Sequence, residues 1–371
     1  MSSAADRVAI YCTSDAGYAL PSLVALASLR RFHPEHSYFL VADREKIHPS
    51  LEKTIRDQDV ELVHFDDRQL FSGGAHLTRE CYWKFLGPKL FSERGFRYSM
   101  SIDGDILCVR PFHFAEVLPR VEGYAGIRRN ESPRSWTFRY PDWVQQHFQI
   151  SPQVMEGDYT NTGVLIWNNQ RMMELGLLER AIACYRVGCR VHPRMFRVGD
   201  QSLMALISEI HPRLPWFVLP AEDNFRVYSE SERCRLLDSD SIRLIHYSGC
   251  KPWRPDSLMD CFRNAGKPAF MHRMAFKAKW ESFVEDTMPF WRDLSMKEAD
   301  PVRRITRGTR YTLLDLARQA ILSRVGVFTI CRLRGLLGYP LNPLDTGWSR
   351  NSAIGKPQSR RDALSPRSSP S

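Results

Sequence analysis

Apolar and polar positions follow two different periods along the first half of the chain. Short apolar runs, typical of buried strands, alternate with segments in which apolar residues recur every three or four positions, as in residues 20–29. The runs predict strands over residues 7–12, 37–42, 60–65, 98–102, 163–167 and 242–247, and the helical spacing predicts helices over residues 18–32, 78–91 and 202–210. Strands that alternate with helices favour an α/β fold with an open, mostly parallel sheet covered by helices.

One stretch, residues 128–159, departs from this order and is rich in aromatic side chains. Long irregular segments of this kind often cover a site or hold a ligand. The alternative is a surface excursion whose aromatic rings pack on one another. The sequence leaves both interpretations open.

The composition is that of a globular protein, with 371 residues of which 43% are hydrophobic and 25% charged. No apolar run reaches the roughly 18 residues of a membrane-spanning helix, and we expect no signal peptide. The nine cysteines are odd in number and lack Cys-x-x-Cys spacing, which argues against a disulfide framework and against a cysteine zinc site. These features favour a reducing, cytoplasmic location.

The positive charge of the chain is concentrated at its C-terminus. The formal net charge is +10, and residues 301–371 contain 13 Lys and Arg against 3 Asp and Glu, so the first 300 residues are neutral. Residues 303–334 predict a basic amphipathic helix suited to an anionic lipid surface, with a helix docked on the domain as the alternative. No nucleic-acid-binding module is recognisable there. Residues 351–371 have a disordered composition.

The pattern Asp-x-Asp occurs three times, and only Asp103-Gly104-Asp105 directly follows an apolar strand. Ligands bind beyond the carboxyl ends of the strands in open α/β sheets. Two carboxylates there can hold Mg²⁺ or Mn²⁺, although a solvated turn is the alternative. His246 ends another predicted strand, so we expect it at the same edge, where an imidazole beside two carboxylates favours Mn²⁺ over Ca²⁺.

The residues after His246 suit a phosphate group. Gly249 lets the backbone come close to a ligand, and Lys251 supplies a positive charge.

Six short motifs, in this order over residues 7 to about 260, resemble glycosyltransferase family 8, the retaining UDP-sugar glycosyltransferases that include lipopolysaccharide galactosyltransferases and glycogenin. The motifs are Ile10-Tyr-Cys-Thr-Ser-Asp15-Ala-Gly-Tyr18, Tyr82-Trp-Lys84, Ser101-Ile-Asp103-Gly-Asp105, Asn161-Thr-Gly163-Val-Leu165, Asp200-Gln201 and His246-Tyr-Ser-Gly249-Cys-Lys251-Pro-Trp253. The resemblance implies a GT-A fold, in which a Rossmann-like, mostly parallel sheet is flanked by helices. It also implies a hexosyltransferase.

The resemblance implies a role for each matching residue. Metal ligands, for Mn²⁺ or else Mg²⁺ bridging the diphosphate of a UDP-sugar, would be Asp103, Asp105 and His246. Contacts with the donor are implied for Thr13, Asp15, Tyr18, Lys84, Gly249 and Lys251. The reacting face of the sugar would be lined by Asn161, Asp200 and Gln201.

Transfer leaves negative charge on the diphosphate, which a divalent cation and Lys251 would stabilise. The family has no obvious carboxylate nucleophile, so the resemblance implies same-face attack through a short-lived ion pair, with Gln201 as an electrostatic stabiliser. Asp200 is the alternative nucleophile or orienting group. Asp200 could also be simply the N-cap of the following helix, and Lys84 could lie on a solvated helix face.

We therefore expect a manganese-dependent enzyme that transfers galactose, or else glucose, from a UDP-sugar to a lipid-linked or polysaccharide acceptor. A metal-dependent nucleotide-sugar hydrolase and a membrane-bound nucleotide-binding scaffold are the alternatives. The expected organisation is a catalytic domain over residues 1–260, a helical extension over 261–300, a basic membrane-associating segment over 301–350 and a disordered tail over 351–371. This places the enzyme at the cytoplasmic face of the membrane, in lipopolysaccharide biosynthesis, with no nucleic-acid partner.

Overall fold

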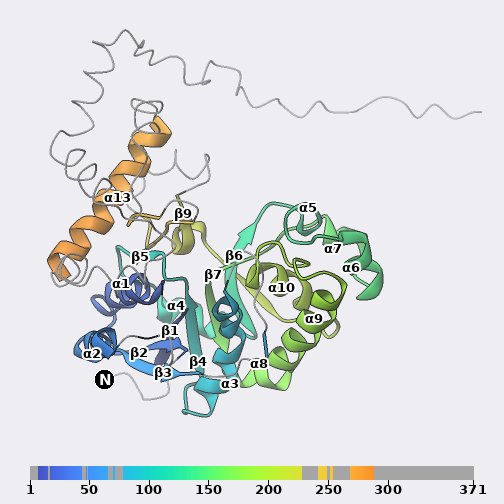
Figure 1. Cartoon of the computed structure of the whole chain (residues 1–371), viewed down its shortest axis with the longest axis horizontal. Coiled ribbons are helices and arrows are strands. Elements are labelled where there is room, and N and C mark those ends of the chain that lie inside the picture. The colour runs from blue at the N-terminus through green and yellow to red at the C-terminus, as the bar shows by residue number, and fades with distance from the viewer. Residues whose placement is uncertain are drawn as a thin grey trace, which may run out of the picture.

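A computed structural model describes residues 7–15, 17–43, 47, 49–65, 70–71, 78–227, 241–248, 251–253 and 268–287. These residues form a seven-stranded sheet of order β3-β2-β1-β4-β7-β6-β8 and a three-stranded sheet of order β5-β10-β9 (Figure 1). The strands of the main sheet are β1 (Val8–Ser14), β2 (Ser37–Ala42), β3 (Glu61–His64), β4 (Tyr98–Ile102), β6 (Tyr124–Arg129), β7 (Tyr159–Asn168) and β8 (Trp216–Leu219). Those of the small sheet are β5 (Ile106–Cys108), β9 (Phe225–Arg226) and β10 (Leu244–His246).

The main sheet is mostly parallel, as the alternation of strands and helices predicts. Strands β1 to β4 pair in parallel, as do β6 and β8. Strand β7 runs antiparallel to both of its neighbours, β4 and β6, a reversal that the sequence did not predict. Because of this reversal, the first residues of β7 lie beside the carboxyl end of β4, where Ile102 pairs with Val164.

Helices cover both faces of the main sheet, because alternate side chains of its strands enter two separate cores. One core is covered by α1 (Ala19–Arg30), α2 (Pro49–Asp57), α4 (Phe114–Val117), η4 (Leu118–Arg120) and α13 (Pro268–Thr287). The other is covered by η3 (Arg79–Leu86), α3 (Gly87–Ser92), α8 (Asn169–Glu174), α9 (Leu177–Val191) and α10 (Asp200–Ile207). Figure 1 shows these two sets of helices on either side of the strands.

Helix α1 is buried on nearly all sides because it packs against the main sheet and also against the small sheet. Its sequence is apolar all round, as expected for a helix enclosed in this way. The backbone N–H of Cys108, in β5, donates a hydrogen bond to Ser28 Oγ at 2.9 Å. This hydrogen bond joins the small sheet to α1.

Two predicted segments differ in the structure. The helix predicted over residues 78–91 is a 3₁₀ helix, η3, followed by the short helix α3. The predicted irregular segment 128–159 contains three short helices, α5 (Pro133–Trp136), α6 (Pro141–His147) and α7 (Pro152–Met155), each with a proline in its first turn. Strands β5, β6 and β8 and helix α9 were not predicted.

The described cysteines, which include Cys12, Cys108 and Cys184, are free thiols. No helix in the part of the chain that the structure describes has the length and hydropathy needed to span a bilayer. The basic segment predicted over residues 303–334 and the tail 351–371 lie outside the described residues.

Candidate active site

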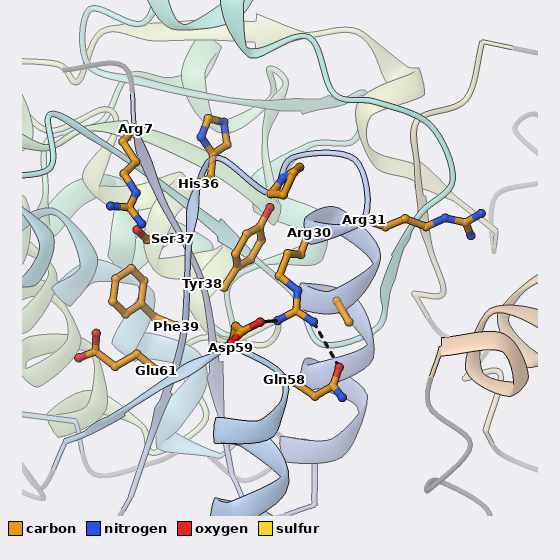
Figure 2. Close-up of a pocket in the computed structure, with 12 residues that line it drawn as sticks. Arg7, Arg30, Arg31, His36, Ser37, Tyr38, Phe39, Gln58, Asp59 and Glu61 are labelled. Atoms are coloured by element: carbon orange, nitrogen blue, oxygen red, sulfur yellow. Dashed lines mark hydrogen bonds and ion pairs between the residues drawn. The ribbon is translucent and has the colours of Figure 1, made fainter. Parts of the chain in front are cut away.

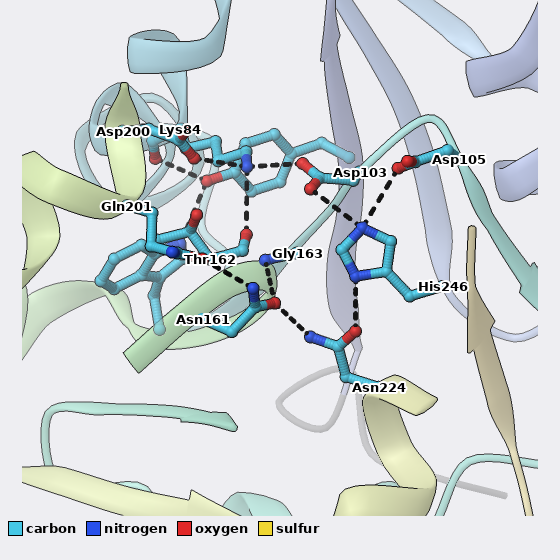
Figure 3. Close-up of polar contacts among 12 residues, drawn as sticks. Lys84, Asp103, Asp105, Asn161, Thr162, Gly163, Asp200, Gln201, Asn224 and His246 are labelled. Carbon is cyan, nitrogen blue, oxygen red and sulfur yellow. Dashed lines mark hydrogen bonds and ion pairs between the residues drawn. The ribbon is translucent and has the colours of Figure 1, made fainter. Parts of the chain in front are cut away.

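Three strands bring Asp103, Asp105 and His246 together at the carboxyl end of β4 (Figure 3). Asp103 follows β4, Asp105 precedes β5, and His246 is held beside Asp105 because it pairs with Ile106. His246 Nε2 lies 3.6 Å from Asp103 Oδ2 and 3.4 Å from Asp105 Oδ1. Two carboxylates and one imidazole at these distances are a donor set suited to Mn²⁺, so the residues present fit the implied metal.

Glycines at two positions allow this close packing. A Cβ atom on Gly104 would lie 2.5 Å from Ser22 Oγ of α1, so a side chain in the turn between the aspartates would displace the Ser22 hydroxyl. A Cβ atom on Gly163 would lie 2.4 Å from His246 Cε1. The imidazole of His246 therefore rests directly on the backbone of β7.

Two lysines compensate the charge of the aspartates. Lys84 Nζ donates hydrogen bonds to Asp103 Oδ1 at 2.5 Å, to Asp200 Oδ2 at 2.6 Å and to the Thr162 carbonyl at 3.0 Å. Lys84 is only 3% exposed, so the alternative of a solvated helix face is wrong. Burial alone would lower the pKa of Lys84, but Asp103 and Asp200 outweigh it and raise that pKa above its ordinary value.

Lys251 plays the corresponding part for Asp105, to which its Nζ donates a hydrogen bond. Burial disfavours the charged form of each side chain, yet their mutual attraction prevails. The pKa of Asp105 is held far below its usual range, and the pKa of Lys251 is raised. Both lysines thus keep their charge beside the carboxylates.

The backbone of η3 at Lys84 is held by hydrogen bonds from the main sheet, which fixes where the Lys84 side chain starts. Tyr11 Oη donates a hydrogen bond to the Lys84 carbonyl at 2.7 Å, and Trp167 Nε1 donates to Tyr11 Oη at 3.1 Å. Tyr11 belongs to β1 and Trp167 to β7, so the tight 3₁₀ turn is held by two strands of the main sheet.

The residues predicted for the sugar's reacting face lie together on the other side of Gly163. Asn161 Nδ2 donates a hydrogen bond to Gln201 Oε1 at 2.6 Å. Asp200 is the first residue of α10 after the N-cap Gly199, and its carboxylate binds Lys84, so the interpretation of Asp200 as the N-cap is wrong.

Two further residues, Asn224 and Tyr159, belong to this cluster and were not predicted. Asn224 Oδ1 lies 2.7 Å from His246 Nδ1, and Tyr159 Oη accepts a hydrogen bond from Gln201 Nε2 at 3.3 Å. Neither residue stands in a recognisable motif. Tyr159 is the last residue of the aromatic-rich stretch 128–159, which is the one signal that favoured it.

The donor contacts predicted from the first motif, Thr13, Asp15 and Tyr18, lie at the carboxyl end of β1. Thr13 Oγ1 is buried and has no hydrogen-bond partner among the described residues. Asp15 Oδ1 accepts a hydrogen bond from the Tyr18 backbone N–H at 2.9 Å and so closes the turn into α1. The centre of the Tyr18 ring lies 5.8 Å from Lys251 Nζ, so Tyr18 is a neighbour of the lysine that pairs with Asp105. Gly249 lies outside the described residues.

A cavity of about 740 Å³ lies at the opposite, amino ends of β1 and β2 (Figure 2). Arg30, in its wall, is already bound to Gln58 at 3.3 Å and to Asp59 at 3.4 Å. Arg31 points away from the other labelled side chains. The cavity contains none of the residues predicted for the active site.

The sequence around these site residues matches a known protein family. The model of the family described as Glycosyl transferase family 8 matches residues 9–257. The chain belongs to glycosyltransferase family 8. The resemblance carried by the six motifs is therefore confirmed. As a family 8 member, the protein is a retaining glycosyltransferase in a hexosyltransferase family, and its mostly parallel mixed sheet flanked by helices is GT-A-like.

Solved structures similar to this family 8 chain include three other transferases. The bifunctional glycosyltransferase WbbM is 18% identical, with a TM-score of 0.49 over 69% of this chain and 48% of that chain. The galactosyltransferase LgtC, in complex with donor and acceptor sugar analogs, is 15% identical, with a TM-score of 0.47 over 67% and 90%. Mouse xyloside xylosyltransferase 1 is 15% identical, with a TM-score of 0.43 over 66% and 99%. The chain thus spans about half the length of WbbM, and no curated protein matches it.

Proposed function

We propose that this family 8 enzyme transfers galactose, or else glucose, from a UDP-sugar to a glycan or glycolipid acceptor, with Mn²⁺ bound by Asp103, Asp105 and His246. The observation that carries the proposal is the convergence of their ligand atoms within 4.8 Å, at the edge of the sheet where nucleotide ligands bind. Residues 1–260 would form the catalytic domain, with the helical extension following.

A divalent cation bound there supplies Lewis-acid stabilisation of the diphosphate leaving group. The chain adds its own charge at the same place. Lys251 lies beside Asp105 and is partly exposed, so its ammonium can donate to a phosphate oxygen when the donor binds. Gly249, two residues before Lys251 in the sequence, would let the backbone approach the same phosphate.

Asp200 is poorly suited to act as the nucleophile. Its carboxylate is buried, and its Oδ2 accepts a hydrogen bond from Lys84 Nζ at 2.6 Å, so its charge is already paired with an ammonium group. We assign it an orienting role toward the sugar. Gln201, with its amide held on both sides by Asn161 and Tyr159, is then the group whose dipole stabilises the developing positive charge of the sugar ring.

The segment over residues 128–159 borders the reacting face and is proposed to contact the acceptor. The Thr137 carbonyl accepts a hydrogen bond from Ser202 Oγ, next to Gln201, at 2.7 Å. Some of the segment's aromatics pack on neighbours, as Trp143 does on His147. Trp136, however, is 56% exposed, which leaves an amphipathic ring available for a sugar.

The proposal is tested by measuring UDP release from a panel of UDP-sugars, with and without Mn²⁺, for the wild type and for Asp105→Ala. We expect metal-dependent release with one sugar, reduced about 100- to 1,000-fold in the variant. The matched control is Asp57→Ala, which alters another Asp-x-Asp pattern whose carboxylate is 56% exposed and pairs with Lys53; its rate should equal that of the wild type.

Two outcomes would count against this function. Release that ignores both the metal and Asp105→Ala would show that the site is misplaced. Metal-dependent release that no acceptor accelerates would favour the nucleotide-sugar hydrolase.

A further inference from the structure

The side chains between Gln201 and His246 form one hydrogen-bonded chain, and a backbone group sets its direction (Figure 3). The Gly163 backbone N–H lies 3.0 Å from Asn161 Oδ1. A backbone N–H can only donate, so the amide atom of Asn161 that faces it must be the oxygen. The orientation of the Asn161 carboxamide is therefore fixed by β7 itself.

This orientation propagates in one direction to Gln201. With its oxygen facing Gly163, Asn161 presents its NH₂ group to Gln201, 2.6 Å away. The atom of Gln201 that accepts this hydrogen bond is Oε1, and the Gln201 NH₂ group is left to donate to Tyr159 Oη at 3.3 Å.

The same orientation propagates in the other direction to His246. Asn161 Oδ1 also faces Asn224 at 2.7 Å, and because it is an acceptor, Asn224 must present its NH₂ group. Asn224 Oδ1 then faces His246 Nδ1 at 2.7 Å, so Nδ1 carries the proton of the neutral ring. The lone pair is left on Nε2, the nitrogen that faces Asp103 and Asp105.

We propose that Asn224 is a positioning residue that keeps His246 in the tautomer able to bind a metal ion and joins this ligand to the sugar's reacting face. The inference rests on the proposed function in one respect, since it assumes that His246 is a metal ligand. Partners behind a metal-binding histidine fix its tautomer and ring orientation, and losing one costs about 10- to 100-fold in affinity or activity.

The backbone around Asn224 is built to hold it in place. Asn224 is the last residue of η5 (Ala221–Asn224) and is completely buried. Before it, the Arg243 N–H donates to the Glu222 carbonyl at 2.9 Å, and after it, the Val227 N–H donates to the His246 carbonyl at 3.0 Å. Both contacts join η5 and β9 to the strand that carries His246, so Asn224 and His246 are fixed as one unit.

The test compares Asn224→Ala with Asn224→Asp, since aspartate can still accept from His246 but can no longer donate to Asn161. The matched control is Asn169→Ala. Asn169 is equally buried and also makes two side-chain hydrogen bonds, to Ser99 and Phe96, near the opposite end of β4. Three quantities are measured: the Mn²⁺ dissociation constant by electron paramagnetic resonance without donor, the His246 tautomer by ¹⁵N NMR of the metal-free protein at pH 8, and kcat.

We expect Asn224→Ala to weaken Mn²⁺ binding about 10- to 100-fold and to move proton density from Nδ1 to Nε2 of His246. Asn224→Asp should keep the Nδ1–H tautomer and Mn²⁺ affinity within about threefold, while kcat falls about tenfold because Asn161 loses its donor. Asn169→Ala should lower the stability and leave Mn²⁺ affinity and the tautomer unchanged.

The positioning role is overturned if Asn224→Ala binds Mn²⁺ as the wild type does, or if the wild-type ring carries its proton on Nε2. It is also overturned if Asn169→Ala weakens Mn²⁺ binding equally, because the effect would then follow stability alone. Failure of the proposed function gives a different result: the wild type would show the Nδ1–H tautomer yet bind neither Mn²⁺ nor any UDP-sugar.

Discussion

Two clusters of histidine and carboxylate side chains lie at opposite ends of the main sheet. Asp103, Asp105 and His246 lie at the carboxyl end of β4, whereas a second cluster, His33, Glu35 and His36, precedes β2 at the amino end. In both clusters the possible ligand atoms lie within 4.8 Å of one another. Proximity therefore does not distinguish them, and the hydrogen bonds around each ring do.

His33 is unable to act as a metal ligand in its observed setting. The Phe112 backbone N–H donates to His33 Nε2 at 2.8 Å, which occupies the lone pair of that nitrogen. The proton of the neutral ring is then on Nδ1, where it faces Glu35 Oε1 at 3.2 Å. His246 has the opposite arrangement, with its proton turned toward Asn224 and its lone pair toward the carboxylates.

The second cluster has a packing role instead. The rings of His33 and His36 are stacked with centroids 5.7 Å apart, and the ring of Phe114 meets both edge-on. The same residue types at similar distances serve packing at one end of the sheet and suit metal binding at the other. A set of metal ligands is therefore recognised by the lone pairs that remain available, and residue type and distance are not enough.

The largest effect is expected from removing the charge that balances the first cluster, in Lys84→Met. Asp200 would then lie buried without its cation, and Asp103, whose side chain is 30% exposed, would lose the same partner. Breaking a buried ion pair in this way costs about 3–5 kcal/mol of unfolding free energy, which urea denaturation measures.

The control is Lys53→Met. It removes an exposed pair with Asp57, at 2.6 Å on α2, and should cost less than about 1 kcal/mol. Equal losses in the two variants would mean that Lys84 contributes no more than a surface lysine does.

The next prediction tests the two clusters against each other with one histidine variant from each, His246→Ala and His33→Ala. His246→Ala removes a proposed metal ligand and should lower the rate of UDP release about 100- to 1,000-fold, a loss typical of one missing electrostatic stabiliser. His33→Ala should leave the rate and the stoichiometry of one Mn²⁺ per chain unchanged, while costing about 1–3 kcal/mol of stability because the Phe112 N–H loses its acceptor. Isothermal titration calorimetry reports the stoichiometry; two Mn²⁺ ions in the wild type, with one lost in His33→Ala, would reverse our assignment of the second cluster.

Sequence patterns predicted the α/β class, the β1–β4 half of the sheet and most of the residues that gather around Asp103. They did so because buried parallel strands are continuous apolar runs, and because residues directly after such strands meet at one edge of the sheet. Tyr98–Ile102 is bounded in the structure as the pattern predicts.

The other half of the sheet was less predictable, for physical reasons. The direction of β7 depends on its pairing with β4 and β6, which no local pattern records. Asn224 does not directly follow an apolar run and lies 22 residues before His246, so only the tertiary fold brings the two together. The position of the lone pair on each histidine ring likewise depends on partners that are distant in the sequence. For His246 the partner is Asn224, which Asn161 orients. For His33 the partner is the Phe112 backbone N–H.

The smallest expected effect is on the pH dependence of the free energy of unfolding, to which His36 of the second cluster contributes. Burial lowers the pKa of His36 to about 4, opposed by Glu35 and assisted by His33 and Arg7, whereas the unfolded chain has the ordinary value near 6.5. Between these values the unfolded state takes up a proton that the folded state excludes, so the free energy of unfolding falls as the pH falls from about 6.5 to 4.

The variant His36→Phe keeps an aromatic ring against His33 and Phe114 but cannot be protonated, so it should lose up to about 3 kcal/mol less than the wild type between pH 7 and pH 4. Urea denaturation at several pH values measures this difference, and a pair of curves at pH 8, where His36 is neutral in both states, corrects for any change in packing. Burial opposes the ionisation of Glu35, but its hydrogen bonds and the charges of both histidines lower its pKa, so the change in Glu35 on replacing His36 adds to the difference only at the acidic end of the range. Parallel curves over the whole range would show that His36 takes up a proton as readily in the folded protein as in the unfolded chain, and the second cluster would then have to be treated as solvated.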